Sequence, residues 1–348
     1  MGLHLSTCWK SLKKVREVMS QNTMLQMLVM PTPEGGRYKA TEVQIPVPGA
    51  GEVLIQVKAS SVNRGETQSV LKHKDPSAKP LVTGIEFAGV IFAVGKDVQG
   101  WKVGDEVMTR SPAGFAQFAI APVKSLMKKP SSVSWLEAGC IPNVFITAHD
   151  ALVTAGNIKN AQSVLVTAGS SGVGVTGIQM ARYFGINQVF ATTRSDHKIA
   201  SLKALGASAV FNTEDPKWVD ELLALTGNQG VDLIMDQVGS SLFDANMKAL
   251  ALGGRIITVG RNAGNMANIN LDELARKNAS VIGRTFRTRT ISQTQECSRR
   301  FDEDCAVGVA NGSIKVILDR SFKFTQLDEA QAYLMSNGQT GKIAIEVS

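Results

Sequence analysis

The pattern of hydrophobic and polar positions changes once along the chain. In the first part, short apolar stretches with partial alternation are separated by glycine-rich turns, as in half-buried antiparallel strands. The clearest stretches are 51–59, 84–95 and 104–108. This part of the sequence predicts a compact, mostly β-stranded domain that begins near Met24 and ends in a helical connector over residues 135–155.

Beyond the connector, apolar strands alternate with amphipathic helical segments. Six such strands are predicted, at 164–168, 189–193, 209–212, 232–237, 255–260 and 280–286. Regular alternation of strands and helices is typical of a doubly wound parallel sheet, and six strands complete one. The predicted fold class is therefore α/β, with a six-stranded parallel sheet beside the β domain.

The chain continues after this sheet is complete. Past Arg289 it predicts a helix, a strand over 314–319, a second helix over 327–335 and a final strand over 342–347. Because a finished sheet offers these strands no place, we expect them to return to the first domain. The predicted domains are 24–150 together with 291–348, and 151–290 between them.

Composition changes this picture mainly by exclusion. Of the 348 residues, 44% are hydrophobic and 19% are charged, which is ordinary for a globular protein of two domains. No apolar run approaches the roughly 20 residues that span a bilayer, and the 4 cysteines lack CxxC spacing. We therefore expect a reducing, cytoplasmic location without a membrane partner. The net charge of +7 is too diffuse to favour nucleic acid.

Residues 1–23 differ from the rest of the chain. This segment is basic, but it has no apolar stretch that could form the core of a secretory signal. A transit peptide, a surface helix and an extension before a start at Met24 all fit its sequence. We predict a basic N-terminal extension without a catalytic role.

The most informative motif follows the first strand of the predicted parallel sheet. The apolar strand runs into a glycine turn and an amphipathic helix, with the spacing Gly172-x-Gly174-x-x-Gly177. Such glycines allow a tight turn and let backbone N–H groups approach a pyrophosphate at the helix N-terminus. An ordinary glycine turn is the alternative, but the flanking strand and helix favour a dinucleotide site. The predicted contacts come from the turn residues Gly169, Ser170, Ser171, Gly172, Val173 and Gly174.

The end of the next strand bears on which dinucleotide binds. An NAD site has an acid there, about 20 residues further on, that binds the ribose 2′-hydroxyl. This strand ends instead in Thr193-Arg194-Ser195, and Lys198 follows closely. Hydroxyls and cations suit a 2′-phosphate, so Thr193, Arg194 and Lys198 predict NADP(H). A solvated basic loop is the alternative, and Asp196 in the same turn weakens the prediction slightly.

Two later turns are expected at the same edge of the sheet. Val238-Gly239 follows the fourth strand and Gly260-Arg-Asn262 follows the fifth. Ligands of open α/β sheets bind outside the carboxyl ends of the strands. Val238, Gly260 and Asn262 are therefore candidate contacts of the nicotinamide ribose, although both glycines would equally suit simple turns.

Several further motifs occur in the order of a known family. They are Ser61-Val-Asn63, Gly84-Ile-Glu-Phe-Ala-Gly-Val90, Val103-Gly-Asp-Glu-Val107, Ile141-Pro142, Thr147-Ala148, Leu205-Gly-Ala207, Asp236-x-Val238-Gly239, Phe286-Arg-Thr-Arg289 and Gly341-Lys342. With the glycine turn, they resemble the medium-chain dehydrogenases/reductases of the zinc-free, ζ-crystallin-like quinone oxidoreductase branch, over almost all of the chain from Met24. The resemblance implies a GroES-like β domain split around a Rossmann domain, and a homodimer.

The same resemblance implies roles for individual residues. It places Asn63 beside the nicotinamide, where its amide would orient cofactor or substrate, and Lys342 near the cofactor. Asn143 and Thr147 match positions that touch the cofactor. A turn-forming asparagine and a surface lysine are the alternatives for Asn63 and Lys342. His149 lies on an apolar helix, which favours a core histidine over an acid or base.

The residues also bear on metal chemistry. Zinc members of this superfamily bind the metal with a Cys, a His and a second Cys, but the His element here is Gly84-Ile85-Glu86 and no Cys lies near Asn63. Cys140 alone suits a buried small hydrophobe, so no metal is predicted. Without a Lewis acid, an electron-poor acceptor is easier to reduce than an alcohol is to oxidise. The expected reaction is hydride transfer from NADPH to a quinone or other α,β-unsaturated carbonyl.

Two alternative functions stay open. Many relatives that reduce enones or enoyl thioesters carry a Tyr a few residues after the Asn, and the segment Asn63–Ser69 has none, so no proton donor is assigned. An enoyl-thioester reductase is one alternative. A protein that keeps the cofactor site without catalysis, as crystallin or RNA-binding relatives do, is the other.

Overall fold

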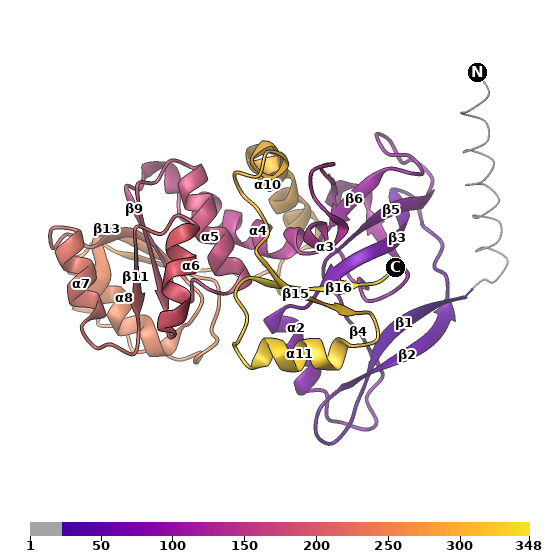
Figure 1. Ribbon diagram of the computed structural model, residues 1–348, viewed down its shortest axis with the longest axis horizontal. Coiled ribbons are helices and arrows are strands. Elements are labelled where there is room, and N and C mark those ends of the chain that lie inside the picture. The colour runs from indigo at the N-terminus through magenta and orange to yellow at the C-terminus, as the bar shows by residue number, and fades with distance from the viewer. Residues whose placement is uncertain (1–22) are drawn as a thin grey trace.

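The computed structural model describes residues 23–348, so the predicted N-terminal extension lies, apart from Thr23, outside the described residues. Two lobes lie side by side along the long axis, one built on a six-stranded sheet and the other on two further sheets (Figure 1). Helix α4 (Ile141–His149) lies between them. In the described part of the chain, no helix has the length and apolar character needed to cross a membrane.

The six-stranded sheet is parallel and has the order β11-β10-β9-β12-β13-β14. Its strands are β9 (Ser163–Val166), β10 (Gln188–Thr193), β11 (Ala209–Asn212), β12 (Val231–Asp236), β13 (Leu250–Thr258) and β14 (Ser280–Gly283). In sequence order this is 3-2-1-4-5-6, the doubly wound order of the Rossmann fold. The predicted α/β class is thus confirmed, although β13 begins earlier and β14 ends earlier than expected.

Alternation of buried positions along the strands explains why helices cover both faces of this sheet. On β9, Val164 and Val166 share a core with α5 (Gly172–Tyr183) and α6 (Ile199–Ala204). Leu165 shares the opposite core with α7 (Trp218–Leu225) and α8 (Phe243–Ala249). Strands buried on both faces are continuously apolar, as the sequence pattern shows.

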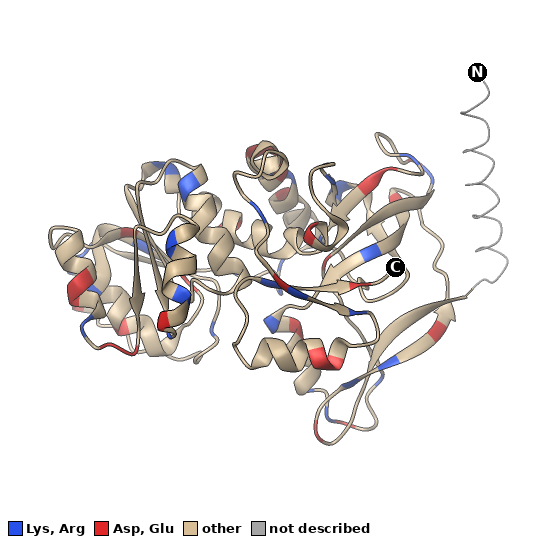
Figure 2. Ribbon diagram, viewed as in Figure 1, with Lys and Arg blue, Asp and Glu red and all other residues tan. Residues whose placement is uncertain are grey.

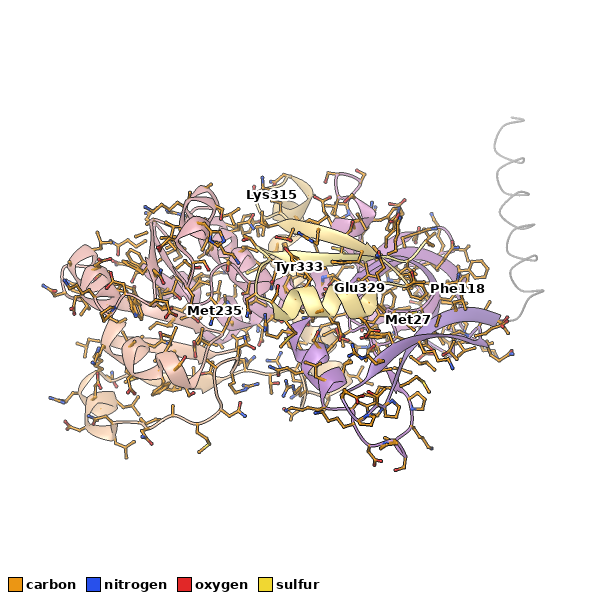
Figure 3. The ribbon with its side chains drawn as sticks, turned by 60° about the horizontal axis from the view of Figure 1, so that its bottom comes forward. Met27, Phe118, Met235, Lys315, Glu329 and Tyr333 are labelled. Atoms are coloured by element: carbon orange, nitrogen blue, oxygen red, sulfur yellow. The ribbon has the colours of Figure 1, made fainter. Side chains whose placement is uncertain are left out.

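Helix α5 packs closely on the sheet because a glycine lies on the face that it turns toward β12. A Cβ on Gly177 would lie 2.3 Å from the Cε of Met235, which projects from β12 (Figure 3). The third glycine of the fingerprint therefore lets the helix approach the strands, the role expected from the motif.

The other lobe contains a seven-stranded sheet and a three-stranded sheet. The larger sheet has the order β15-β16-β3-β5-β6-β8, and β7 also pairs with β3. Its strands are β3 (Glu52–Ser61), β5 (Phe87–Val94), β6 (Glu106–Thr109), β7 (Phe118–Pro122), β8 (Leu126–Lys128), β15 (Leu318–Lys323) and β16 (Lys342–Glu346). The smaller sheet is antiparallel and contains β2 (Arg37–Gln44), β1 (Thr23–Met30) and β4 (Leu81–Val82). Because β16 pairs with β3, the end of the chain joins a sheet begun before the Rossmann strands.

One predicted strand is misplaced. The structure has β15 at Leu318–Lys323, whereas the apolar run predicted a strand over 314–319. Ile314 and Val316 are buried in the core beside Phe301, and pairing begins only where Leu318 meets Lys342 of β16. The apolar run therefore marks burial, not strand pairing.

The predicted helical connector consists of α3 (Trp135–Ala138), α4 and the π-helix η2 (Asp150–Ala155), which continues α4 across the predicted domain boundary. Its N-terminus has a capping box in which the Ser134 hydroxyl and the Glu137 carboxylate each accept the other's backbone N–H. The remaining helices are α2 (Arg64–Leu71), α9 (Leu271–Arg276), α10 (Ile291–Ala310), α11 (Leu327–Met335) and the 3₁₀ turns η1 (Val123–Ser125), η3 (Ile158–Asn160), η4 (Asp196–Lys198) and η5 (Ser240–Leu242).

Candidate functional site

The glycine turn before α5 opens the N-terminus of this helix. The Ser171 hydroxyl accepts from the Gly174 N–H at 3.0 Å and so caps the helix. A Cβ on Gly174 would lie 2.4 Å from the carbonyl oxygen of Ala168, whereas one on Gly172 would lie 2.7 Å from the Cδ of Lys342. Gly174 is thus required by the turn itself. Gly172 instead leaves the free N–H groups of the first helical turn accessible to an anion.

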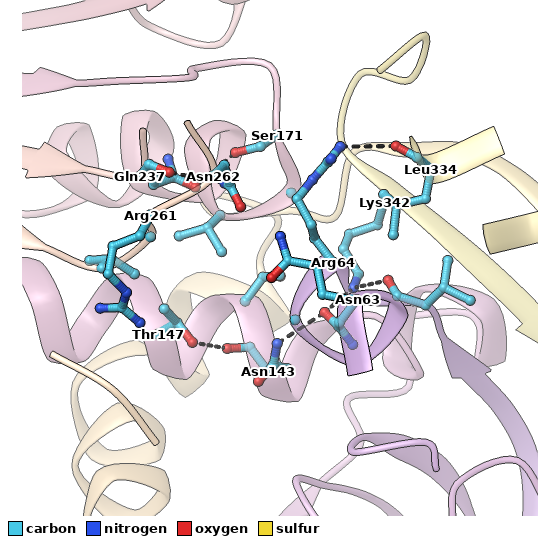
Figure 4. A pocket seen from close by; sticks show the side chains of 18 of the residues that line it. Asn63, Arg64, Asn143, Thr147, Ser171, Gln237, Arg261, Asn262, Leu334 and Lys342 are labelled. Atoms are coloured by element: carbon cyan, nitrogen blue, oxygen red, sulfur yellow. Dashed lines mark hydrogen bonds between the residues drawn. The ribbon is translucent and has the colours of Figure 1, made fainter. Parts of the chain in front are cut away.

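A cleft of about 300 Å³ lies between the lobes beside this turn (Figure 4). Nine predicted site residues line it, namely Asn63, Asn143, Thr147, Ser171, Gly172, Val173, Gly260, Asn262 and Lys342. The other predicted site residues do not line it, namely Gly169, Ser170, Gly174, Thr193, Arg194, Lys198 and Val238. The structure therefore brings half of the predicted pyrophosphate contacts together with most of the predicted nicotinamide contacts. The three predicted 2′-phosphate contacts all lie outside this cavity, as do the remaining turn residues and Val238.

The floor of the cleft is organised around Glu86, whose side chain is fully buried. Its Oε1 accepts from the Ser61 hydroxyl at 2.5 Å, the Asn63 Nδ2 at 2.8 Å and the Lys342 Nζ at 3.0 Å. Its Oε2 accepts from the backbone N–H of Asn143 at 2.7 Å. A buried carboxylate requires such partners, so Glu86 fixes residues from β3, α4 and β16 relative to one another.

Lys342 acts within this network through its ammonium group. Besides Glu86, its Nζ donates to the Val62 carbonyl at 3.2 Å and to the Asn63 Oδ1 at 2.9 Å. An ammonium has three N–H donors, so these bonds use all of them. Only the carbon stem of Lys342 faces the turn, beside Gly172. A role toward the cofactor would therefore fall to this stem, while the charge holds Asn63.

A second set of bonds extends from Asn63 along α4. The Asn63 Oδ1 also accepts from the Asn143 Nδ2 at 2.9 Å, and the Asn143 Oδ1 accepts from the Arg110 Nε at 3.1 Å. The Thr147 hydroxyl donates to the Asn143 carbonyl at 2.6 Å, as Figure 4 shows. Burial lowers the pKa of Arg110, and the nearby carboxylates of Glu86 and Glu66 oppose this shift. The amide of Asn63 is thus held in one orientation at the edge of the cleft.

The turns after β12 and β13 form the opposite wall. Gln237 accepts from the Ser171 hydroxyl at 2.8 Å, and its carbonyl accepts from the Asn262 Nδ2 at 2.9 Å. A Cβ on Gly260 would lie 2.5 Å from that carbonyl oxygen, so the two turns can approach only at a glycine. Val238 instead donates its N–H to Asp236 at 3.0 Å, outside the lining.

The end of β10 carries the predicted phosphate contacts, and they differ in availability. Arg194 is exposed, and no carboxylate of the described residues forms a salt bridge with it. Lys198 is buried, and its Nζ donates to the carbonyls of Asn337 at 3.0 Å and Gln339 at 2.8 Å. Burial lowers the pKa of Lys198, as does the charge of Arg194. Lys198 therefore fixes the segment between α11 and β16, whereas Arg194 is exposed and its guanidinium forms no salt bridge among the described residues.

A further cation reinforces this region. Arg64, at the start of α2, donates to the Leu334 carbonyl at 2.9 Å and to the Asn337 Oδ1 at 2.7 Å. Burial lowers its pKa first, and the charge of Arg194 lowers it further. Arg64 of the β lobe and Arg194 of the Rossmann lobe are thus close enough for their charges to interact, on a surface where basic and acidic residues are interspersed (Figure 2).

Glu66 lines an adjoining cavity of about 430 Å³, together with Asn63 and Arg110. Its Oε1 accepts from the Gly84 N–H at 2.7 Å. Burial raises the pKa of Glu66 to about 7, the Gly84 bond opposes the shift, and the charge of Glu86 adds to it. A carboxyl group that titrates near neutrality can donate or accept a proton, which gives this site an acid–base group.

Sequence reasoning missed five of these residues: Arg64, Glu66, Glu86, Arg110 and Gln237. One signal was available, because Glu86 is an acid inside an otherwise apolar strand motif and a buried acid needs partners. Nothing local in the sequence marks Arg64 or Arg110, whose partners lie far along the chain.

The described residues also bear on metal binding. Within residues 23–348, no three side chains of Cys, His, Asp or Glu are grouped so that they could hold a metal ion. Cys140 is fully buried, and burial raises the pKa of its thiol to about 12, as suits a core residue. His149 is buried too, with its Nε2 2.8 Å from Asp304 and its ring beside Phe301. It is a core histidine, as the apolar helix indicates.

Comparisons with known proteins agree with this architecture. The family model for the alcohol dehydrogenase GroES-like domain matches residues 49–131, and the model for the zinc-binding dehydrogenase domain matches residues 172–303. Human quinone oxidoreductase is 29% identical over 311 residues, which cover 88% of this chain and 92% of that protein. The acryloyl-coenzyme A reductase of Sulfurisphaera tokodaii is 26% identical over 351 residues, which cover 92% and 100%.

Solved structures give the same assignment. The structure of a mycobacterial quinone oxidoreductase superimposes with a TM-score of 0.82 at 26% identity, covering 93% of this chain and 100% of that one. The likeness extends over both lobes and therefore includes the cleft between them. Members of this family bind nicotinamide cofactors and are oxidoreductases. The chain belongs to the medium-chain dehydrogenase/reductase superfamily, in its quinone oxidoreductase branch.

Proposed function

We propose that the protein transfers hydride from NADPH to a quinone or another α,β-unsaturated carbonyl, and that it does so without a metal ion. The observation that carries the proposal is the cleft in which the open N-terminus of α5 faces the network of Asn63, Glu86 and Lys342. Relatives named quinone oxidoreductase support the acceptor class. The test is whether added quinone or enone accelerates NADPH oxidation by the purified protein.

The residues of the cleft fit a nicotinamide dinucleotide. The first turn of α5 offers N–H groups for the pyrophosphate because Gly172 carries no side chain there. Gln237 and Asn262 are fixed by hydrogen bonds at the ends of β12 and β13, where the ribose would bind. When bound, the nicotinamide supplies the hydride, and the protein positions it.

Asn63 and Arg110 are placed to act on the acceptor. The amide of Asn63 is held by Glu86, Lys342 and Asn143, so it can orient a carbonyl group without reorganising. Arg110 uses its Nε toward Asn143 and keeps its terminal N–H groups for an oxygen that gains negative charge. A metal would have no comparable site here, because the position of the zinc-ligating His is Ile85.

Replacing Arg194 by Ala is expected to raise the dissociation constant of NADPH at least about tenfold and to leave that of NADH within about twofold. Arg194 is the exposed cation at the end of β10, and only NADPH carries the 2′-phosphate. Titration of cofactor fluorescence gives both constants. Lys203→Ala, an exposed cation on α6, is the matched control and should change neither. Equal weakening of both cofactors would show that Arg194 does not recognise the phosphate.

The reduction of an enone is expected to lose activity above pH 7. Because burial raises the pKa of Glu66 to about 7, this group is protonated and able to donate below that pH, and it loses the proton above it. The ratio kcat/KM should be constant on the acid side and fall about tenfold per pH unit on the alkaline side. Glu66→Gln should remove this dependence and lower the plateau, whereas the exposed Glu329→Gln should alter neither. An unchanged pH profile in Glu66→Gln would exclude Glu66 as the donor.

The same raised pKa has a consequence for stability. The folded protein holds the proton of Glu66 more tightly than the unfolded chain does, so protonation favours folding. This contribution is complete below the unfolded pKa of about 4.3 and is lost as the pH rises through about 7.

An enoyl-thioester reductase is the second candidate, supported by the relative named acryloyl-coenzyme A reductase. Glu66 would meet its need for a proton donor, since the segment after Asn63 has no Tyr. Preference for acyl thioesters over free quinones and enones would favour this candidate.

We also propose a cytoplasmic homodimer, as the family resemblance implies. Strand β14 is the last strand of its sheet and has no partner on its outer side among the described residues. The backbone N–H and C=O groups on this outer edge would pair with the same strand of a second copy and so extend the sheet.

A further inference from the structure

A second, larger cavity of about 770 Å³ adjoins the site. It shares Ile85, Arg110 and Phe286 with the cavity that contains Asn63 and Glu66. The two spaces are therefore neighbours across these three side chains. The larger one lies within the β lobe, between the first strands of the chain and the start of α10.

The walls of this cavity are mainly apolar. They include Met24, Val43, Pro46, Val82, Phe118 and Ile120. Phe118, on β7, lies in the β lobe at the far end from the Rossmann sheet (Figure 3). A concave space lined mainly by apolar side chains is characteristic of a small-molecule binding site. The volume falls in the range of pockets that bind small molecules, roughly 300–1,000 Å³.

Arg110 marks the boundary between the polar and the apolar space. Its guanidinium carbon lies 4.4 Å from the centre of the Phe286 ring, and that of Arg289 lies 4.4 Å from the same ring. The Nε of Arg110 donates to the Asn143 Oδ1, and among the described residues no acceptor binds the terminal nitrogens of Arg110. A ligand that spans both cavities would therefore place a polar group against the guanidinium of Arg110 and an apolar group beyond it, in the larger cavity.

We propose that the hydride acceptor is amphipathic, with a carbonyl head beside Asn63 and Arg110 and a carbon chain that fills the apolar cavity. This inference rests on the proposed function and adds the substrate class to it. A lipophilic quinone or a long-chain enone has this chemistry. The carbonyl head of the acceptor would occupy the smaller cavity, beside Asn63. Its carbon tail would pass Ile85, Arg110 and Phe286, which line both cavities, and enter the larger one.

The test is a series of 1,4-benzoquinones with methyl, butyl, hexyl and octyl tails, reduced with NADPH by the full-length protein. Each buried CH₂ is expected to lower KM about three- to fourfold until the cavity is full. The tail is remote from the reacting carbon and binds equally in ground and transition states, so kcat should stay constant. A KM that does not depend on tail length would overturn the proposal.

Val43→Trp fills the cavity from the partly exposed strand β2. It should raise KM for the octyl quinone about tenfold or more and change that for the methyl quinone less than about twofold. Val47→Trp is the matched control, because Val47 is 83% exposed and outside the cavity. Equal effects of Val43→Trp on both quinones would contradict the inference.

These outcomes separate the inference from the function beneath it. If short quinones and enones are reduced but tail length has no effect, the apolar cavity is not the substrate site and the proposed function stands. If no member of either series is reduced at any tail length, the proposed function itself fails.

Discussion

Replacing Gly172 by Val is expected to weaken NADPH binding by at least about 100-fold. The side chain would enter the space in front of the first turn of α5, where an added Cβ alone would lie 2.7 Å from the Cδ of Lys342. Loss of two charge-assisted hydrogen bonds to the pyrophosphate, each contributing about 1.5–3 kcal/mol, accounts for this magnitude. Isothermal titration of NADPH measures the change.

Gly283→Val is the matched control, because it adds the same side chain at a strand position with open space around it. A second variant, Val173→Glu, separates binding from folding. An acid in the first turn of α5 favours the helix, but it repels a phosphate. Folded Gly172→Val and Val173→Glu variants with wild-type affinity for NADPH would show that the pyrophosphate binds elsewhere.

Replacing Lys342 by Met is expected to lower the free energy of unfolding by about 3–5 kcal/mol. The side chains of Lys342 and Glu86 are 5% and 0% exposed, with 3.0 Å between the Nζ and the Oε1. Without the ammonium, the Glu86 carboxylate stays buried with no opposite charge in contact. Urea denaturation gives the change from the shift in midpoint.

Two further variants make this prediction specific. Lys323→Met removes a lysine whose partner, Glu346, is also partly exposed, and it should cost less than about 1 kcal/mol. Adding Glu86→Gln to Lys342→Met should restore part of the lost stability, because it removes the unpaired charge. Comparable losses of unfolding free energy for Lys342→Met and Lys323→Met would mean that the buried ion pair stabilises the protein no more than the exposed one does.

The strands, the glycine turn and the topology follow from local patterns, and they could be predicted for that reason. Apolar period, turn residues and the order of strands and helices are all present in short stretches of sequence. Of the two roles expected for these glycines, the structure shows the tight turn at Gly174, where a Cβ would lie 2.4 Å from the carbonyl oxygen of Ala168. A motif shows that glycine is needed, but only the structure shows which neighbour requires it.

The site could be predicted only in part, because its decisive contacts join distant segments. Lys198 resembles a phosphate ligand in sequence, yet its ammonium is bonded to carbonyls near residue 338. Lys342 and Glu86 are 256 positions apart, and no local pattern couples them. The raised pKa of Glu66 comes first from burial, which depends on how α2 packs beside Gly84 in the folded chain. Such features arise from tertiary structure alone.

The most direct test is a steady-state comparison of acceptors with the chelator-treated full-length protein. Quinones, enones and enoyl thioesters are supplied with NADPH, and alcohols are supplied with NADP⁺. We predict that quinones or enones are reduced, that NADPH is preferred to NADH at least about tenfold, and that alcohol oxidation is negligible. Three results would contradict the metal-independent reduction of quinones or α,β-unsaturated carbonyls at this cleft. They are robust alcohol oxidation, activity that requires added zinc, and tight NADPH binding without reduction of any acceptor.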